Sequence, residues 1–296
     1  MYMTMKKIIC AGLALLMCGG LVFSVTACSG DDDDDNGNSG VVNNDLGLRV
    51  IAVGDYKYSY YDDGKLEAIY FYNEPIKFTY KPDKITFSEE EDEYRDEPNS
   101  VDVSYTSQGY LKSLSLSDEE YKLSAVYTYD GDGHLTKISS SYSAPNEKYR
   151  NEATLTWRND LLRMIVWGCE DYDEDETDSE SHRITFDYDG DNPIENPYLQ
   201  FAASLIEFVG IGDGDLEEGL AHIGKLGKGP KYLPSACQRE WEETEGSRVR
   251  NGSSKSEFKY GFNIDNALSY VMIGNERINY RYEFVDSRIS KSNDIR

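Results

Sequence analysis

The chain has 296 residues, of which 39% are hydrophobic and 29% charged, and its formal net charge is −25. Such an acidic chain is repelled by nucleic acid phosphates and by anionic lipid headgroups, so its charge excludes nucleic acid as a partner and argues against direct binding to an anionic membrane surface. At this length, one large β domain fits the sequence as well as two small domains do.

The first 27 residues have the layout of a secretory signal peptide, in which Lys6 and Lys7 precede an apolar run that ends in small residues. The last of these, Val25-Thr26-Ala27-Cys28, resemble the bacterial lipobox, where a lipoprotein signal peptidase cuts before an acylated cysteine. This resemblance implies cleavage before Cys28 and attachment of the mature chain to a membrane through lipid on that residue. The alternative is an uncleaved helix, because residues 8–27 are nearly long enough to span a bilayer.

Residues 28–44 are interpreted as an acidic, disordered tether. They include consecutive aspartates from Asp31 to Asp35, followed by Gly, Asn and Ser. Because this segment has almost nothing apolar to bury, we expect an extended leash that holds the folded part away from the lipid. An acidic patch just after the lipidated cysteine also resembles the surface-export signal of lipoproteins in Bacteroides-type bacteria; the alternative is a plain spacer. Loss of residues 1–27 removes two lysines and no acid, which changes the net charge from −25 to −27.

A hairpin unit recurs through residues 45–296, which we interpret as a single β-rich domain. An aromatic residue is followed by Gly or Asn four positions later, by an aliphatic residue at six and usually by another at nine. The copies begin at Tyr60, Tyr105, Tyr129 and Phe262, with a partial copy at Tyr188 and a version one residue shorter at Trp157. Gly and Asn suit tight turns, and the flanking segments alternate as strands with one buried face do. The sequence predicts an antiparallel β-meander that forms a curled sheet or an incomplete barrel.

The unit Tyr129-Asp130-Gly131-Asp132-Gly133-His134-Leu135 resembles the tyrosine-aspartate repeats of large bacterial shell proteins. The chain as a whole resembles Bacteroides-type surface lipoproteins that carry a domain of unknown function with a porin-like fold. This resemblance covers nearly everything after Asn44 and rests on the lipobox, the hairpin units and the segment Asp191-Asn192-Pro193-Ile194. It implies a strand meander, and neither a pore nor an activity.

A helical insertion is predicted at about residues 196–224, where the apolar period changes from two to that of a helix. Asn196 and Pro197 suit the start of a first helix, and Asp215 and Gly224 suit the start and the end of a second. The polar face of the first helix lacks the Lys and Arg of a membrane-surface helix. We therefore expect the insertion to be a plug or lid on the core of the sheet.

Two cysteines remain in the folded part, because Cys10 and Cys18 leave with the signal peptide and Cys28 is acylated. Cys169 and Cys237 are far apart in sequence, and their spacing leaves open whether they form a disulfide or stay free.

We predict no catalytic residue, cofactor or metal site. The histidines, His134, His182 and His222, lie near no cysteine or second histidine at ligand spacing, and His134 is expected to be an exposed turn residue. Alternating aspartates could hold Ca²⁺; they are Asp171, Asp173 and Asp175, then Asp187, Asp189 and Asp191, and finally Asp213 and Asp215. The first set lacks the Gly and Glu of an EF-hand loop, and the second is explained equally well by turn chemistry.

The sequence favours a non-enzymatic outer-membrane lipoprotein, exposed at the cell surface, whose contact with the membrane is the lipid on Cys28. Its ligand would be a glycan or another envelope protein. Trp157, Trp167 and Trp241 could stack on sugars, although aromatic residues in strands also serve cross-strand packing. The alternatives are an assembly accessory that docks an outer-membrane partner through exposed sheet edges, and a glycan hydrolase, for which no nucleophile, metal or phosphate motif is present.

Overall fold

The computed structural model describes residues 42–43, 48–72, 74–81, 84–89, 100–117, 122–145, 147–173, 177–196, 219–220, 223–265 and 267–285. The predicted signal peptide, Cys28, the tether as far as residue 41 and the first predicted helix lie outside these residues. Within the described part, no helix is both long enough and apolar enough to cross a membrane.

Strands form almost all of the described chain. They are β1 (Val42–Asn43), β2 (Leu48–Val53), β3 (Tyr56–Tyr60), β4 (Leu66–Phe71), β5 (Glu74–Lys81), β6 (Lys84–Glu89), β7 (Ser100–Tyr105), β8 (Leu111–Ser117), β9 (Lys122–Tyr129), β10 (Leu135–Ala144), β11 (Glu147–Arg158), β12 (Leu161–Asp173), β13 (Thr177–Asp187), β14 (Ala236–Glu245), β15 (Arg248–Phe262), β16 (Leu268–Ile273) and β17 (Glu276–Phe284). Burial alternates along them: in β9, Ala125 and Tyr127 are buried while Val126 and Thr128 are exposed. The predicted period of two is therefore present, and it separates an inner face from an outer face.

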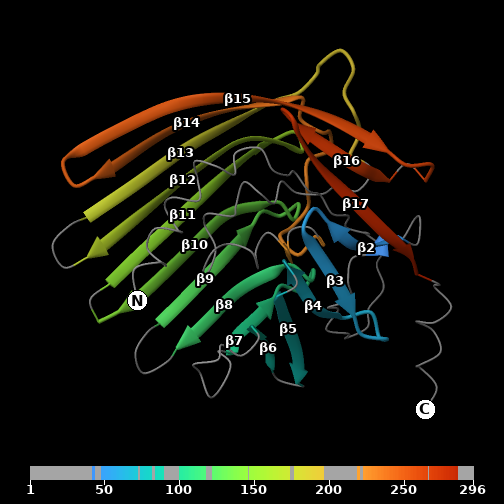
Figure 1. Cartoon of the computed structure of the whole chain (residues 1–296), viewed down its shortest axis with the longest axis horizontal. Coiled ribbons are helices and arrows are strands. Elements are labelled where there is room, and N and C mark those ends of the chain that lie inside the picture. Colours follow the sequence, from blue (N-terminus) through green and yellow to red (C-terminus); the bar gives the residue numbers. More distant parts are fainter. Residues whose placement is uncertain are drawn as a thin grey trace.

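The sheet closes into a barrel (Figure 1). Each strand from β2 to β17 pairs antiparallel with the next, and β17 pairs with β2 through contacts such as Tyr280 with Val53, which completes a ring of 16 strands. The two-residue β1 adds to β2. The prediction of a curled sheet or incomplete barrel was right about the antiparallel meander and wrong about closure. Closure pairs the first long strand with the last and so satisfies backbone groups that an open sheet would leave at two edges.

A β-bulge lies at the same place in five hairpins, and it explains the spacing of the repeated unit. The register shifts after Ser59, Ser104, Leu135, Thr156 and Gly261 or beside their partners. Aliphatic residues three apart would face opposite sides of a regular strand, but the extra residue of a bulge brings both to the same side. The pairs Leu66 and Ile69, Leu111 and Leu114, Leu135 and Ile138, Leu162 and Ile165, and Leu268 and Val271 are accordingly all buried.

Aromatic side chains tie five strands or strand ends to the preceding strand. A ring hydroxyl or indole N–H donates a hydrogen bond to the main-chain carbonyl of the first buried aliphatic residue of the neighbouring strand. The donor and acceptor residues are Tyr80 and Leu66, Tyr129 and Leu111, Trp157 and Leu135, Tyr188 and Leu162, and Tyr282 and Leu268. Each bond satisfies a carbonyl inside the barrel, and a net gain of about 1 kcal/mol is typical of such a bond. In the repeated unit, Tyr129, Trp157 and Tyr188 therefore act as structural fasteners.

One end of the barrel, which we call the plugged end, carries the repeated turns and is filled by residues 223–235. Leu220, Ile223 and Leu226 are buried in the main core cluster. The backbone joins the wall, because the Leu111 amide donates to the Lys225 carbonyl and the Lys228 amide donates to the Gly133 carbonyl. Leu220 and Ile223 of the predicted insertion thus pack into the core as expected of a plug, and the segment after the insertion, residues 225–235, fills the rest of this end. Most of the two predicted helices lies outside the described residues; Gly219 and Leu220, within the second, have helical backbone.

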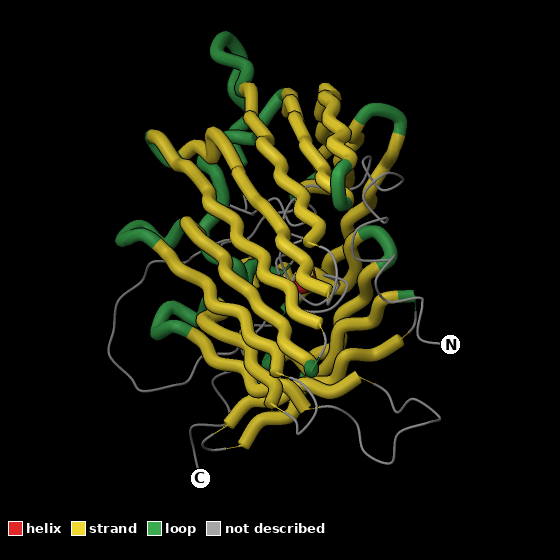
Figure 2. The backbone as a smooth tube through the Cα atoms, turned by 90° about the vertical axis from the view of Figure 1, so that its left-hand side faces the viewer, coloured by secondary structure: helices red, strands yellow, loops and turns green. Residues whose placement is uncertain are grey.

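The barrel wall is uneven in height (Figure 2). β12 has 13 residues and β15 has 15, whereas β4 and β16 have six each. We call the part of β10–β15 that extends away from the plugged end the tall wall. Phe258 to Phe262 of β15 pair with β16, while its earlier residues, Arg248 to Glu257, pair with β14. Among the described residues, no strand lies along the other edge of this earlier part of β15.

Candidate functional site

Two histidines are buried in the barrel, and each stacks on a tryptophan. His134 lies on Trp157 with ring centroids 4.3 Å apart and an interplanar angle of 19°. His182 lies on Trp167 with centroids 4.1 Å apart and an angle of 7°. Each histidine is 2% exposed, so the expectation that His134 is an exposed turn residue was wrong. His134 lies in a turn, as predicted, but its ring is buried and packs on Trp157 of the neighbouring hairpin.

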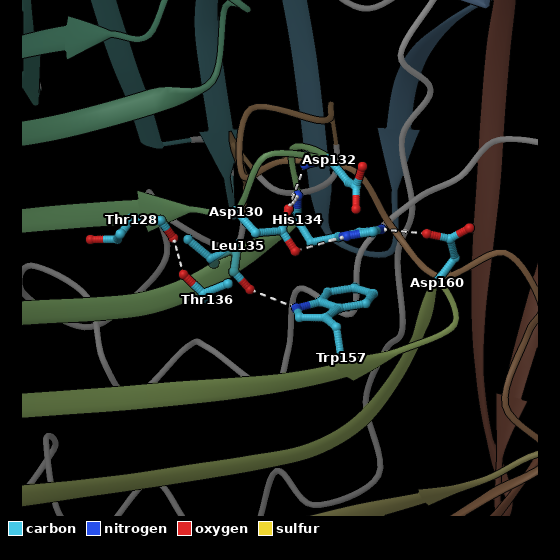
Figure 3. A network of polar contacts seen from close by, with 8 residues as sticks. All are labelled: Thr128, Asp130, Asp132, His134, Leu135, Thr136, Trp157 and Asp160. Carbon is cyan, nitrogen blue, oxygen red and sulfur yellow. Dashed lines mark hydrogen bonds and ion pairs between the residues drawn. The ribbon is translucent and has the colours of Figure 1, made fainter.

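His134 is held by the turn that joins β9 to β10 (Figure 3). Asp130 Oδ1 accepts hydrogen bonds from the backbone amides of Asp132 and His134, and Gly133 takes a left-handed conformation with φ of 86°. The other oxygen of Asp130, Oδ2, lies 3.2 Å from His134 Nδ1. A short aspartate that captures amides two and four residues ahead is common turn chemistry, so the sequence itself builds this arrangement.

A neighbouring hairpin completes the surroundings of His134. Trp157, at the end of β11, donates its indole N–H to the Leu135 carbonyl and covers one face of the imidazole. His134 Nε2 has no hydrogen-bond partner, and Asp160 Oδ1 lies 3.7 Å from it. Both ring nitrogens of His134 therefore face carboxylates, one from its own turn and one from the next turn.

The described residues include one group with metal-ligand geometry. One ligand atom from each of Asp130, Asp132 and His134 lies within 4.8 Å of the others. The second calcium set proposed from sequence is not assembled in this way: Asp189 Oδ1 accepts the amides of Asp191 and Asn192, which favours turn chemistry there. Of the first set, Asp175 and the side chain of Asp173 lie outside the described part of the chain. Asp213 and Asp215 lie outside the described residues.

The second histidine belongs to a charged triad in the tall wall. Arg239 of β14 donates from Nε to His182 Nδ1 at 2.7 Å, and His182 Nε2 lies 2.5 Å from Glu180 Oε1. Because Nδ1 accepts from the guanidinium, the hydrogen-bond pattern assigns the imidazole proton to Nε2, which donates to Glu180. A neutral imidazole thus links a buried cation to a buried anion, so neither charge faces an apolar wall without a partner.

Burial lowers the pKa values of His182 and Arg239. Desolvation lowers the pKa of His182 below its usual value, outweighing the hydrogen bond with Glu180, which raises it. Desolvation also lowers the pKa of the Arg239 guanidinium. A second proton on His182 would have to replace the bond from Arg239 Nε, so the geometry and the direction of the His182 shift agree.

The inner face of the tall wall changes character along its height. Residues directly opposite one another across the strands share a face and form rows. Nearest the plugged end the row is Leu155, Ile165, Ile184, Arg239 and Ser254; the next is Ile138, Ala153, Trp167, His182, Trp241 and Gly252. Further out come Ser140, Asn151, Cys169, Glu180, Glu243 and Arg250, and then Tyr142, Tyr149 and Asp171. The wall passes from aliphatic through aromatic to charged and tyrosine-rich.

The tryptophans occupy different positions with respect to ligand contact. Trp167 is 2% exposed beneath His182, and one face of Trp157 is covered by His134. Trp241 is half-buried, and a Cβ on Gly252 would lie 2.7 Å from its ring, so glycine is needed where the indole crosses β15. Tyr142 and Tyr149, both half-buried, stack with centroids 5.1 Å apart and an interplanar angle of 10°. Aromatic faces suited to a sugar are therefore those of Trp241 and the tyrosine pair.

Cys169 and Cys237 are both reduced and form no disulfide with each other. Cys169 lies opposite Glu180 and, through it, Glu243, six residues along β14 from Cys237. Six residues of strand span about 20 Å, far beyond the reach of a disulfide. The register therefore answers the question that the sequence left open.

Sequence reasoning missed the Glu180, His182 and Arg239 triad. The sequence does show Glu180 and His182 two apart, and therefore on one face of a strand, but nothing local points to Arg239, which is 57 residues from His182. The turn at Asp130 was noticed, yet its histidine was read as solvent-facing because Trp157 reaches it from a separate hairpin.

No family model matches this chain, and no curated protein matches it. Among solved structures, a porin-like protein from Bacteroides vulgatus ATCC 8482 is similar over 79% of this chain and 98% of its own, with 18% identity and a TM-score of 0.48. A porin-like protein from Bacteroides uniformis ATCC 8492 is similar over 77% of this chain and 90% of its own, with 12% identity and a TM-score of 0.48.

Proposed function

We propose that this chain is a non-enzymatic lipoprotein of the outer membrane that presents the inner face of its tall wall as a ligand-binding surface at the cell surface. The observation that carries the proposal is the gradient along that wall. Apolar side chains pack the plugged end, whereas Tyr142, Tyr149, Trp241, Glu243 and Arg250 lie further out and keep part of their surface in solvent. Rigid strands hold these side chains, which suits recognition.

The lipid on Cys28 is the proposed contact with the membrane. A barrel wall that faces lipid needs an outward apolar band about 25 Å tall. The outward positions of β10, β11 and β13 are instead polar; they are Lys137, Ser139, Ser141, Ser143, Lys148, Arg150, Glu152, Thr154, Ser179, Ser181, Arg183 and Thr185. This polarity favours a barrel that stands in water on the tether.

Anchoring is tested by substitution of the acylated residue. The wild-type chain should incorporate labelled fatty acid and partition with detergent-extracted membranes, while Cys28→Ala should do neither. Cys237→Ala, which removes a thiol in the barrel, is the matched control and should behave as wild type. Fatty-acid labelling that survives Cys28→Ala would overturn the anchor.

We propose a glycan as the ligand class, because flat aromatic rings beside charged and hydroxyl groups suit the apolar faces and hydroxyls of sugars. Tryptophan fluorescence of the full chain against a polysaccharide panel should reveal a binder whose affinity falls about tenfold or more in Tyr149→Ala. Tyr172→Ala is the control, because Tyr172 is 43% exposed on the outer face of β12. No fluorescence change with any polysaccharide of a broad panel, or an equal loss of affinity in both variants, would contradict this site.

Docking of an envelope protein is the second candidate, and closure of the barrel narrows where it can occur. Nearly every strand edge is paired within the ring, but Arg248 to Ser256 of β15 pair only with β14 among the described residues. An extended segment of a partner could add a strand there. Pull-down from detergent-solubilised envelope should then recover one stoichiometric partner, which is lost when Ser253→Pro removes an amide from the free edge and retained in Ser253→Ala, which keeps that amide; recovery of none counts against docking.

A further inference from the structure

We propose that Asp130, Asp132 and His134 form a binding site for a divalent transition-metal ion of the zinc class. One ligand atom from each residue lies within 4.8 Å of the other two. All three come from one turn, and Asp130 and Asp132 are exposed while His134 is buried. An ion can therefore reach the two carboxylates from solvent and bind Nδ1 of His134, whose ring is held in place by its neighbours.

The separation of the Asp130 and His134 ligand atoms matches that of a tetrahedral site. Asp130 Oδ1 is occupied by two backbone amides, which leaves Oδ2 as the free oxygen, and Oδ2 lies 3.2 Å from His134 Nδ1. Ligands bound at 2.0–2.1 Å around tetrahedral zinc are about 3.3 Å apart. An ion between these atoms would need little movement of either side chain, and Asp132 would supply the third ligand.

The second observation is the support behind the imidazole. Histidines that bind metals usually direct their other ring N–H at a carboxylate, which fixes the tautomer and the ring orientation. His134 Nε2 is buried, has no hydrogen-bond partner and lies 3.7 Å from Asp160 Oδ1. Trp157 holds the ring plane by stacking. Asp160 thus lies on the Nε2 side of the imidazole, and Asp130 and Asp132 lie with the proposed ion on its Nδ1 side, which gives the order carboxylate, histidine, metal (Figure 3).

The other turns of the chain provide an internal comparison. The turn after Tyr188 has aspartates at both corresponding positions, Asp189 and Asp191, and Asp189 Oδ1 also accepts two backbone amides, those of Asp191 and Asn192. Pro193 stands where His134 stands in the β9–β10 turn. The paired aspartates alone are therefore explained by turn formation, and the buried histidine is what sets the β9–β10 turn apart.

The donor set favours zinc and its neighbours over calcium. Ca²⁺ takes six to eight oxygen ligands, whereas imidazole suits Zn²⁺, Ni²⁺ and Cu²⁺. One nitrogen and two carboxylate oxygens make three protein ligands, which leaves a fourth tetrahedral position for water. We expect the site to bind Ni²⁺ and Zn²⁺ much more tightly than Ca²⁺.

The test is calorimetric titration of the chelator-treated full chain in detergent with Zn²⁺ and Ni²⁺, in the presence of excess Ca²⁺ to saturate the acidic surface. One zinc site is expected. Asp132→Asn and His134→Gln should each weaken it tenfold or more, and Asp160→Asn by about tenfold, the lower end of the effect of such supporting groups. Asp191→Asn, the matching aspartate of the turn without histidine, should leave affinity unchanged.

A second readout is optical. Cu²⁺ bound beside His134 should quench Trp157, so quenching should fall in Trp157→Phe and vanish in Asp132→Asn. Asp132 is exposed, and its side chain makes no hydrogen bond or ion pair among the described residues, so this variant separates metal binding from folding. Absence of a zinc site, zinc affinity equal in wild type and Asp132→Asn, or full displacement by Ca²⁺ would each overturn the proposal.

Discussion

The two histidine–tryptophan stacks share chemistry and differ in origin. His134 meets Asp130 four residues away, and the two lie on one turn at the plugged end. His182 meets Arg239 57 residues away, and its triad spans two strands of the tall wall. Around His134 the carboxylates keep access to water, whereas the Arg239 charge is compensated inside the protein. The same pair of rings can therefore be fixed by local sequence in one place and by strand register in the other.

This contrast has an energetic consequence. A buried charge network is weak evidence for extra stability, but removal of one member leaves an uncompensated charge in a poorly solvated place. The loss of one hydrogen bond in an exposed turn costs less stability, because water can take the place of the missing partner. Substitutions in the wall should therefore cost more than substitutions in the turn.

The largest effect is expected for Arg239→Met. The variant leaves Glu180 without its cation and His182 Nδ1 without its donor, and loss of one partner from a buried pair costs about 3–5 kcal/mol. Urea denaturation measures the change in unfolding free energy. Arg183→Met is the control, because the Arg183 side chain is 56% exposed on the outer face, and its cost should stay within about 0.5 kcal/mol. Equal costs would remove the distinction between wall and turn.

Gly133→Ala should come next, at about 1–2 kcal/mol. Gly133 has φ of 86°, and a Cβ there would lie 3.2 Å from the Tyr110 ring, so alanine is strained in conformation and in space. Gly131→Ala in the same turn meets nothing within 4 Å and should change the melting temperature little. A larger loss in Gly131→Ala would contradict the turn geometry.

Trp157→Phe should cost about 1 kcal/mol. Phenylalanine keeps an aromatic face for His134 but cannot donate to the Leu135 carbonyl, so the variant removes a single hydrogen bond. Trp241→Phe is a suitable comparison, because Trp241 is half-buried and no hydrogen bond from its indole is among the described contacts. Chemical denaturation should place the Trp157 variant below the Trp241 variant; the reverse order would contradict the fastening role.

The smallest effect is a pH dependence that vanishes at neutral pH. The pKa of His182 is lowered in the folded state, so the unfolded chain binds the proton first as the pH falls. Stability should be constant above about pH 7 and decline below about pH 6.5, with a slope of at most about 1.4 kcal/mol per pH unit, until the folded pKa is reached. The difference between wild type and His182→Gln across pH 8 to 5 isolates this slope; a stability gain on acidification would reverse the sign.

Much of the fold could be predicted from the sequence, because short repeated segments determine it. Turn glycines, aromatic strand ends and buried aliphatic residues all recur at fixed spacing, and this recurrence predicted the antiparallel meander. The interval of three between Leu135 and Ile138 also encoded a bulge, since no regular strand buries both. Closure was not foreseen, because the pairing of Tyr280 with Val53 joins strands more than two hundred residues apart and no local signal specifies it.

The candidate site was less predictable than the fold. Asp130, Asp132 and His134 stand together in the sequence, but their geometry depends on Trp157, which determines that the imidazole faces inward. The partner of His182 is fixed by register, and register follows from strand lengths that the sequence does not mark. Cys169 and Cys237 illustrate the same limit, since only the pairing of β12, β13 and β14 shows that they are apart.

The fastening bonds imply a rule for how this wall can change height. The sequence distance between donor and acceptor is 14 residues for Tyr80, 18 for Tyr129, 22 for Trp157 and 26 for Tyr188. The residues gained at each step of four are divided between the two strands and the loop that joins them. Within a strand, a pair of added residues restores the original facing of every side chain. A single inserted residue would turn the donor outward and expose the core. Paired insertions therefore let the wall deepen without redesign of either surface, while the plugged end stays the same.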